Sequence, residues 1–289
     1  MTRKDSGILP AETHIGRTAL LVSDLDRMTD FYRTVVGLDV VRESGIESAL
    51  GLDDRPLLVL QRGPDAEPHS RSGTGLYHNA FRVPTRGALG DALARIRDHW
   101  QLDGASDHRV SEALYLTDPE GNGIEIYRDF PRDQWPTSDQ GTIEMTTDPL
   151  DLEPIAAAGT GASQAPPETD VGHVHLEVSS LETFREFYID QLGFELQATM
   201  SGALFVGAGG YHHHIGANTW LNRTRPLEGR GLSWFEIVLP NAAALTAVEK
   251  RLQARGSPFS KTEHTLSVND PDDNEIRFTV ETESKTGEK

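Results

Sequence analysis

The sequence predicts an α+β protein in which a βαβββ module occurs four times. Three observations predict this class: the chain repeats itself, strand-like and helix-like hydrophobic periods follow one another in a constant order, and turn residues separate them. Of the 289 residues, 37% are hydrophobic, as is typical of a folded globular chain. This length is sufficient for two domains of ordinary size.

The two halves of the chain are related by an internal repeat. The segment RTALLVSDLDRMTDFYRTVVGLDVV, which begins at Arg17, aligns with HVHLEVSSLETFREFYIDQLGFELQ, which begins at His173, at an offset of 156 residues. The same offset aligns GLYHNAFRVP at Gly75 with GLSWFEIVLP at Gly231. Near the end of each half, DPEGNGIEIY aligns with DPDDNEIRFT at an offset of 152 residues. Matches in so regular an order indicate a duplicated unit.

Each half contains two modules, and the first half shows how the elements are predicted. Period-2 alternation predicts a strand at 18–22, and helical spacing predicts a helix from Leu25 that ends near Gly37. Short apolar segments then predict strands at 38–43, 47–52 and 56–62. The second module follows the same order, with a strand at 78–83, a helix at 86–100 and strands at 111–118 and 123–129.

The segment between the halves is rich in Pro, Gly, Ala and acidic residues and has no sustained apolar period. This composition predicts a linker, with a helical turn at DLEPIAAA. The first domain is therefore expected at residues 13–131, the linker at 132–169 and the second domain at 170–282.

The composition excludes several kinds of partner and site. The net charge is −18, which repels nucleic acid phosphates and anionic lipids, so neither is an expected partner. The five lysines among so many acidic residues suit a halophile, whose high internal salt screens self-repulsion. There is no cysteine, so any metal must be held by nitrogen and oxygen ligands. The N-terminal residues show no signal-peptide pattern and no long apolar run occurs, which predicts a cytoplasmic protein without a membrane segment.

Four βαβββ modules, with a leucine, an FY pair and a glycine after the first strand of each half, resemble the vicinal oxygen chelate superfamily. In its four-module form the chain is similar to the type I extradiol ring-cleaving dioxygenases of the catechol-2,3-dioxygenase kind. The resemblance implies two glyoxalase/extradiol-dioxygenase-like domains, in which modules pair to form curled mixed sheets. One such pair is expected to surround a metal ion.

The resemblance also implies that two histidines and one carboxylate bind this metal, two from first strands and one from a last strand. The matching first-strand positions are Arg17, His78, His173 and Trp234, and the matching last-strand positions are Glu125 and Arg277. Neither half holds a complete set, so His78, Glu125 and His173 are the expected ligands. This choice predicts that modules two and three share the metal-bearing sheet, whereas modules one and four form a second sheet without a metal.

Strand alternation supports this choice, because Glu125 and Tyr127 share one face, as do His173, His175 and Glu177. His175 and Glu177 are expected to hold the His173 ring. An alternative ligand set remains open. It replaces His173 with His14, which lies three residues before the matching position and would keep the pairing of consecutive modules.

The run of three histidines after Tyr211 is expected on the last strand of module three. The resemblance places an acid–base histidine here, beside a second histidine, and this match assigns the role to His213. A histidine can take and return a proton near neutral pH. Because alternation puts His212 and His214 on the opposite face, the choice within the run stays open.

Further candidates follow from the same resemblance. Tyr115, ten residues before Glu125, matches a tyrosine that hydrogen-bonds the substrate hydroxyl or the bound oxygen. His108 is a candidate for orienting the substrate. His175 and His214 are candidates for contacts with the substrate or with the metal ligands.

The predicted function is therefore cleavage of catechol, or of a substituted catechol, by O2. The expected cofactor is Fe(II), and Mn(II) is the other candidate. A homo-oligomer is expected because members of the superfamily commonly associate. Two other functions remain open: a metal-dependent lyase or isomerase of the glyoxalase type, and a non-catalytic protein that binds small molecules.

Overall fold

The computed structural model describes residues 7–63, 73–139, 141–226 and 229–281, and within them the βαβββ order occurs four times. Module one comprises β1 (His14–Val22), α1 (Leu25–Phe31), the π-helical turn η1 (Tyr32–Val36), β2 (Asp39–Glu43), β3 (Glu47–Leu52) and β4 (Arg55–Arg62). Module two comprises β5 (Gly75–Arg82), α2 (Arg86–His99), β6 (Gly104–Asp107), β7 (Ser111–Thr117) and β8 (Gly123–Asp129). Module three comprises β10 (Asp170–Glu177), α4 (Leu181–Arg185), the π-helical turn η3 (Glu186–Gln191), β11 (Glu195–Met200), β12 (Ala203–Gly207) and β13 (Ile215–Asn218). Module four comprises β14 (Gly231–Leu239), α5 (Ala242–Arg255), β15 (Ser260–Lys261), β16 (Thr265–Asn269) and β17 (Glu275–Val280).

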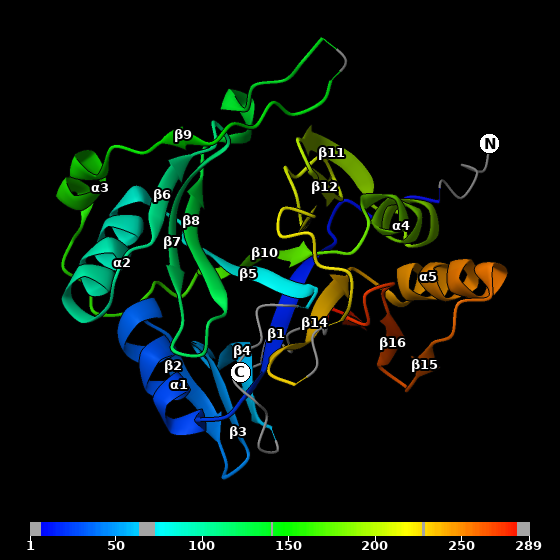
Figure 1. The fold of residues 1–289 in the computed structure, drawn as a ribbon, viewed down its shortest axis with the longest axis horizontal. Helices are drawn as coiled ribbons and strands as arrows, with labels where there is room; N and C mark the ends of the chain where they lie inside the picture. Colours follow the sequence, from blue (N-terminus) through cyan, green and yellow to red (C-terminus); the bar gives the residue numbers. More distant parts are fainter. Residues whose placement is uncertain (1–6, 64–72, 140, 227–228, 282–289) are drawn as a thin grey trace, which may run out of the picture.

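The strands form two curled mixed sheets, which confirms the predicted fold class (Figure 1). One sheet has the order β15-β16-β17-β14-β1-β4-β3-β2, and the other has the order β11-β12-β13-β10-β5-β8-β7-β6, followed by β9 of the linker. Modules one and four therefore share the first sheet, and modules two and three share the second. This is the pairing expected from the ligand positions. The division into 13–131, 132–169 and 170–282 stays a prediction about the sequence units, because neither sheet follows it.

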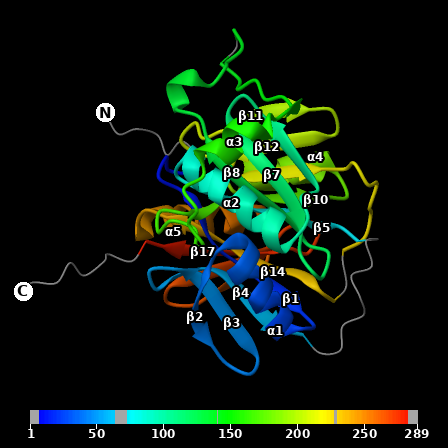
Figure 2. The ribbon, with the colours of Figure 1, turned by 90° about the vertical axis from the view of Figure 1, so that its left-hand side faces the viewer.

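The linker contributes the 3-10 turn η2 (Arg132–Gln134), β9 (Asp148–Pro149) and α3 (Leu152–Ala158). The helical turn predicted at DLEPIAAA is α3, which packs against α2, as Figures 1 and 2 show. Gly90 of α2 allows this approach, since a Cβ atom there would lie 2.4 Å from the Ile155 carbonyl oxygen. The strands β6 and β9 were not predicted from the sequence, because neither short strand carries an apolar alternation. Among the described residues, no helix is both long and apolar enough to cross a membrane.

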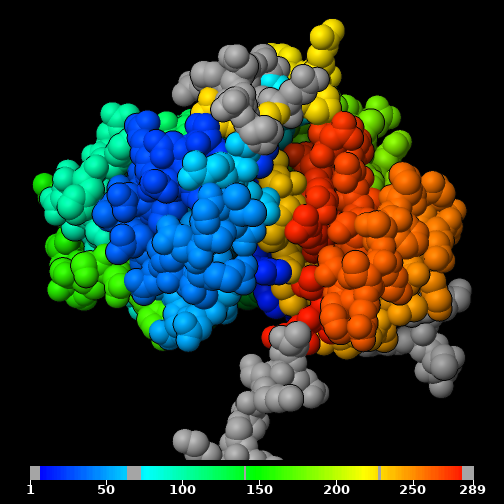
Figure 3. All heavy atoms as spheres, turned by 90° about the horizontal axis from the view of Figure 1, so that it is seen from below, coloured from blue at the N-terminus to red at the C-terminus, as the bar shows by residue number. Residues whose placement is uncertain are grey.

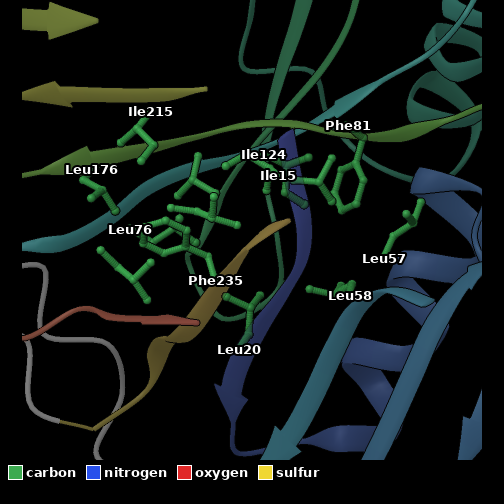
Figure 4. Close-up of a cluster of buried hydrophobic side chains, with 14 of the residues drawn as sticks. Ile15, Leu20, Leu57, Leu58, Leu76, Phe81, Ile124, Leu176, Ile215 and Phe235 are labelled. Carbon is green, nitrogen blue, oxygen red and sulfur yellow. The ribbon is translucent and has the colours of Figure 1, made fainter. Parts of the chain in front are cut away.

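The main hydrophobic core lies between the two sheets and continues under the helices. Figure 4 shows side chains from the central strands of both sheets meeting in this layer, among them Leu20, Leu58, Phe235, Phe81, Leu176 and Ile215. Figure 3 shows the molecule from below, where module one (blue) and the later part of module four (orange to red) lie on either side of a gold strip of residues that includes β14. Since alternate residues of each central strand enter the core, the residues between them face away from it. That outer, curled face is where the sheet can carry polar groups.

A β-bulge adjusts this alternation on β5. Tyr77 is an extra residue between two ladder pairs, His78 with His175 and Leu76 with Leu176. A bulge of this kind bends the strand and redirects a side chain. As a result, the neighbouring residues Tyr77 and His78 both line the same cavity.

Two equivalent hydrogen bonds connect the sheets. The Tyr32 hydroxyl of module one donates to Asp118 of module two at 3.1 Å, and the Tyr188 hydroxyl of module three donates to Asp270 of module four at 2.9 Å. Both aspartates begin the repeated segments DPEGN and DPDDN. Burial raises the pKa of each aspartate to about 6, although several hydrogen bonds oppose the increase. Each bond links two modules that are consecutive in sequence but belong to different sheets.

We expect Tyr32→Phe and Tyr188→Phe each to lower the free energy of unfolding by about 1–3 kcal/mol, because each removes one of the hydrogen bonds to a buried carboxylate. The two losses should add, since the sites share no partner. Urea denaturation followed by circular dichroism would measure them. Tyr77→Phe, a change at an exposed tyrosine, should cost less than about 0.5 kcal/mol. Equal costs for all three variants would contradict this account.

Candidate metal centre

Three potential metal ligands meet on adjacent strands at the centre of the nine-stranded sheet. His78 lies on β5, Glu125 on β8 and His173 on β10, and all three side chains are buried. The Nε2 atom of His78 lies 3.3 Å from Nε2 of His173 and 3.0 Å from Oε2 of Glu125. The same Glu125 oxygen lies 3.3 Å from Nε2 of His173. The structure therefore brings together the three residues predicted as ligands.

The spacing of these atoms fits a metal ion. In an octahedral site with metal–ligand bonds of roughly 2.1 Å, atoms at neighbouring positions are about 3.0 Å apart. The observed separations of 3.0–3.3 Å are close to this value. Two imidazole nitrogens and one carboxylate oxygen on one face of an octahedron suit Fe(II) and leave the opposite face open.

The pKa values of Glu125 and His173 also favour the binding of a cation by the three ligands. Burial raises the pKa of Glu125, but the nearby His173 and His78 rings lower that pKa by a larger amount. The pKa of Glu125 therefore lies well below its usual value. Burial lowers the pKa of His173 to about 4, against the opposing effect of Glu125. At neutral pH the group thus offers a carboxylate and a neutral His173 imidazole, which are the protonation states that metal binding requires.

His14, the alternative ligand, lies elsewhere. It is exposed at the start of β1, in the other sheet, and its Nδ1 atom lies 3.0 Å from the Glu12 carbonyl oxygen. It is absent from the described group of ligand atoms that lie within 4.8 Å of one another. The pairing of β5 with β10 therefore places His173, and not His14, beside His78 and Glu125.

A cavity of about 540 Å³ adjoins the three residues. Its wall is largely apolar and includes Leu76, Val110, Ile124, Met145, Met200 and Phe205. Its polar side chains beside the ligands include the predicted residues His108, Tyr115, His175 and His213. An apolar cavity with a few converging polar groups is typical of a site for a small molecule.

Tyr115 and His108 form a hydrogen-bonded pair on the cavity wall. Nδ1 of His108 lies 2.6 Å from the Thr146 carbonyl oxygen, which only accepts, so Nδ1 carries a proton. In the neutral ring, Nε2 then accepts from the Tyr115 hydroxyl at 2.6 Å. Burial and nearby Glu125 raise the pKa of Tyr115 well above its usual value, so it keeps its proton.

The histidine run does not lie on the last strand of module three, as predicted, but in the connection before it. Gly209 and Gly210 turn the chain with φ values of 61° and 68°, and β13 begins only at Ile215. Strand alternation therefore does not apply to the run. Within the run, His213 lines the cavity, and its ring centroid lies 4.1 Å from that of His173.

The other two histidines of the run are also buried, but the cavity-lining residues do not include them. The ring of His214 accepts a hydrogen bond at Nδ1 from the Ala208 amide at 3.1 Å. His212 lies against Asp129, with 2.8 Å between Nε2 and Oδ1. The structure thus does not bring His214, a predicted contact residue, to this cavity.

His175 lines the cavity, whereas Glu177 has a different role from the one expected. The His175 ring packs against His78, and its Nε2 accepts from the Asn218 side chain at 3.0 Å. The Glu177 carboxylate accepts from the Leu221 amide at 2.9 Å. Among the described residues, His173 Nδ1 has no hydrogen-bond partner, so the predicted support of its ring by this pair is wrong.

Tyr127 and Asp129 also belong to the site, although the sequence-based prediction did not include them. Both follow Glu125 on the same face of β8, so the period-2 alternation contained the signal. Tyr127 packs on His173 with 4.9 Å between ring centroids. The extra β10 residue Gly172 makes room for it, because a Cβ atom there would lie 1.8 Å from the Tyr127 hydroxyl.

The corresponding face of the other sheet carries a different set of side chains. Arg17 forms a two-point ion pair with Glu236, with a nitrogen–oxygen distance of 2.9 Å. The Arg277 guanidinium lies over the Trp234 ring at 4.2 Å from its centroid. Positive side chains thus occupy two positions that match metal ligands in the nine-stranded sheet.

Paired βαβββ modules around a buried His–Glu–His group define a protein of the glyoxalase and dioxygenase fold class. The family model described as the Glyoxalase/Bleomycin resistance protein/Dioxygenase superfamily matches residues 14–126. A catechol-2,3-dioxygenase of Bacillus subtilis (strain 168) is 42% identical over 269 residues, which are 90% of this chain and 94% of that protein. The chain belongs to this superfamily, as its modules and motifs predicted.

Two further proteins are similar to this chain, one in sequence and one in fold. Biphenyl-2,3-diol 1,2-dioxygenase 3 of Rhodococcus globerulus is 33% identical over 146 residues, which are 48% of this chain and 77% of that protein. The crystal structure of glyoxalase I from Zea mays superposes with a TM-score of 0.58 at 14% identity, covering 93% of this chain and 92% of that one. The latter comparison concerns the fold alone.

We expect Fe(II), added without oxygen to the metal-free protein, to raise the melting temperature, because a ligand that binds only the folded state stabilises it. Glu125→Ala should abolish this increase. The control Glu236→Gln, which alters the other sheet, should retain it. Differential scanning calorimetry with metal analysis would measure both effects. An unchanged increase in Glu125→Ala would exclude this site.

Proposed function

We propose that the protein is an extradiol dioxygenase, which opens a catechol ring beside its two hydroxyl groups and inserts both atoms of O2. The observation that carries the proposal is the buried group of His78, Glu125 and His173 beside a cavity that also contains His213. The names of two relatives, a catechol-2,3-dioxygenase and a biphenyl-2,3-diol dioxygenase, support it.

Fe(II) is the proposed metal, and Mn(II) suits the same ligands. His78 and His173 would bind through Nε2, and Glu125 through its carboxylate. When bound, the metal supplies a Lewis acid and a centre at which catecholate and O2 are brought together. The chain's part is to hold the three ligands on one side and to keep the rest of the site enclosed by apolar side chains.

His213 is the proposed acid–base residue. A catechol must lose protons to bind as an anion, and ring opening requires a proton to be returned. Burial and the surrounding imidazoles keep the pKa of His213 well below its usual value, so its neutral ring can accept a proton. The Tyr115 hydroxyl donates a hydrogen bond to His108, which leaves its oxygen to accept a hydrogen bond from a substrate hydroxyl.

The two other functions find less support. Glyoxalase-type enzymes generally need a fourth protein ligand, often a second glutamate, and the described ligand group contains one carboxylate, Glu125. Binding proteins of this fold generally lack a complete ligand set, whereas here all three residues are present and buried. The ring-cleaving function therefore accounts for more of the site.

We also propose a cytoplasmic location in a salt-rich cell. The net charge of −18 and the five lysines support this, because high salt screens the repulsion among carboxylates. The same charge disfavours nucleic acid and anionic lipid as partners. Assembly as a homo-oligomer is proposed by analogy with the superfamily.

Protein loaded with Fe(II) should consume O2 when catechol is added and form a yellow ring-opened product. An oxygen electrode and visible absorbance would follow the reaction over a panel of catechols with different substituents. His78→Ala should lose both signals together with the metal. If fully loaded protein consumes no O2 with any member of the panel, the proposed function is wrong.

His213→Ala should lower kcat by about 10²–10⁴-fold, because the proton then lacks its acceptor in the cavity. Metal content should stay at the wild-type level, since His213 is not among the ligands. The control His264→Ala removes an exposed histidine far from the cavity and should leave kcat unchanged. A normal kcat in His213→Ala would remove this residue from the mechanism.

A further inference from the structure

We infer that Asp129 and His212 are positioning residues that fix which ring nitrogen of His213 carries its proton. This inference rests on the proposed acid–base role of His213. The three side chains form a continuous chain of hydrogen bonds. Nε2 of His212 lies 2.8 Å from Oδ1 of Asp129, and Nδ1 of His212 lies 2.8 Å from Nδ1 of His213. These hydrogen bonds connect the end of β8 with the segment between β12 and β13.

The first link requires a proton on His212. Asp129 Oδ2 accepts from the Tyr211 hydroxyl at 3.0 Å and from the Arg82 guanidinium at 3.2 Å. A carboxylate that already receives these donors, one of them a cation, is ionised and can only accept. Nε2 of His212 must therefore be the donor to Oδ1.

The second link then fixes His213. In a neutral imidazole one nitrogen donates and the other accepts. With its proton on Nε2, the neutral His212 ring accepts at Nδ1, so Nδ1 of His213 is the donor. The proton of His213 is thus held on the side facing His212. Nε2, on the far side of the ring, keeps its lone pair.

This arrangement is what a proton acceptor needs. A histidine can take a proton from a bound catechol only through a nitrogen that has a free lone pair. His213 lines the cavity, while His212, 1% exposed, is enclosed behind it. Asp129 thereby acts through His212, without touching the substrate or the metal ligands. A carboxylate that orients a catalytic histidine through a hydrogen bond has the same role in the Ser-His-Asp triad.

Asp129→Asn gives a directed test. The remaining oxygen of Asn would face the donors Tyr211 and Arg82, which places its NH2 group against His212. Nε2 of His212 would then become an acceptor, its proton would move to Nδ1, and His213 would be forced to carry its proton on Nε2. The expected result is a loss of about 10²–10⁴-fold in kcat with little change in KM or metal content.

The control is Asp170→Asn. Asp170 also pairs with Arg82, at 3.0 Å from its Nε atom, but does not touch His212. Its substitution removes the same charge from the same arginine and should leave kcat near the wild-type value. Asp129→Glu, which keeps a carboxylate, should recover part of the activity lost in Asp129→Asn. Equal kcat losses in Asp129→Asn and Asp170→Asn, or no recovery in Asp129→Glu, would indicate a merely structural role.

His212→Phe provides a second variant in case Asp129→Asn does not fold. It removes the acceptor for His213 and should lower kcat by a factor similar to that of Asp129→Asn. Because both changes act through one chain of hydrogen bonds, the double variant should lose no more than either single variant. Additive losses would show that the two residues act separately and would overturn the inference.

A readout independent of activity separates this inference from the proposed function. In metal-free protein labelled with 15N at histidine, ring nitrogen shifts measured by NMR show which nitrogen of His213 is protonated. We expect the proton on Nδ1 in the wild-type protein and on Nε2 in Asp129→Asn. A wild-type His213 protonated on Nε2, or one that Asp129→Asn does not change, overturns the inference. If the NMR result holds while O2 is not consumed, the proposed function alone fails.

Discussion

The antiparallel pairing of β5 with β10 is the interaction on which the site depends. His78 and His173 are 95 residues apart, and they meet because these strands are neighbours at the centre of one sheet. Within this ladder, bulges at Tyr77 and Gly172 determine which side chains face the cavity. The β8 strand then adds Glu125 by parallel pairing with β5. A chain that paired its modules in sequence order would have separated the two histidines and left each half without a complete ligand set.

The sequence predicted this architecture because its two kinds of signal agreed. The duplication and the hydrophobic periods defined four modules, and the uneven distribution of ligand residues between the halves indicated which modules share a sheet. Segments that lack a hydrophobic period give no local signal of their secondary structure. For this reason β6 and β9 were missed, and His212–His214 were assigned to a strand that begins later, at Ile215. The hydrogen bonds of Glu177 likewise depend on the backbone of a distant segment, which alternation does not reveal.

The two sheets show how duplicated modules can diverge while they keep one architecture. The core faces of both remain apolar, because each sheet must cover the other. The opposite faces have no such shared requirement. In one, neutral imidazoles and a carboxylate surround a cavity; in the other, the Arg17–Glu236 ion pair and the Arg277–Trp234 contact fill the corresponding positions. A guanidinium at a ligand position repels a metal cation, so the face that carries Arg17 and Arg277 does not suit metal binding. Both sheets therefore keep an apolar core face, but the group of potential metal ligands lies in one of them.

The distribution of charge around the cavity follows from the same separation. Glu125 is the anionic member of the ligand group, where a metal cation would balance it. The next carboxylate on that face of β8, Asp129, is instead paired with Arg82, which also pairs with Asp170, and Tyr127 lies between Glu125 and Asp129. Since a charge without a partner in a buried site costs far more than a paired one, the ion pair with Arg82 allows a second carboxylate close to the centre. Asp129 is thereby available to act by orientation, through its hydrogen bond to His212.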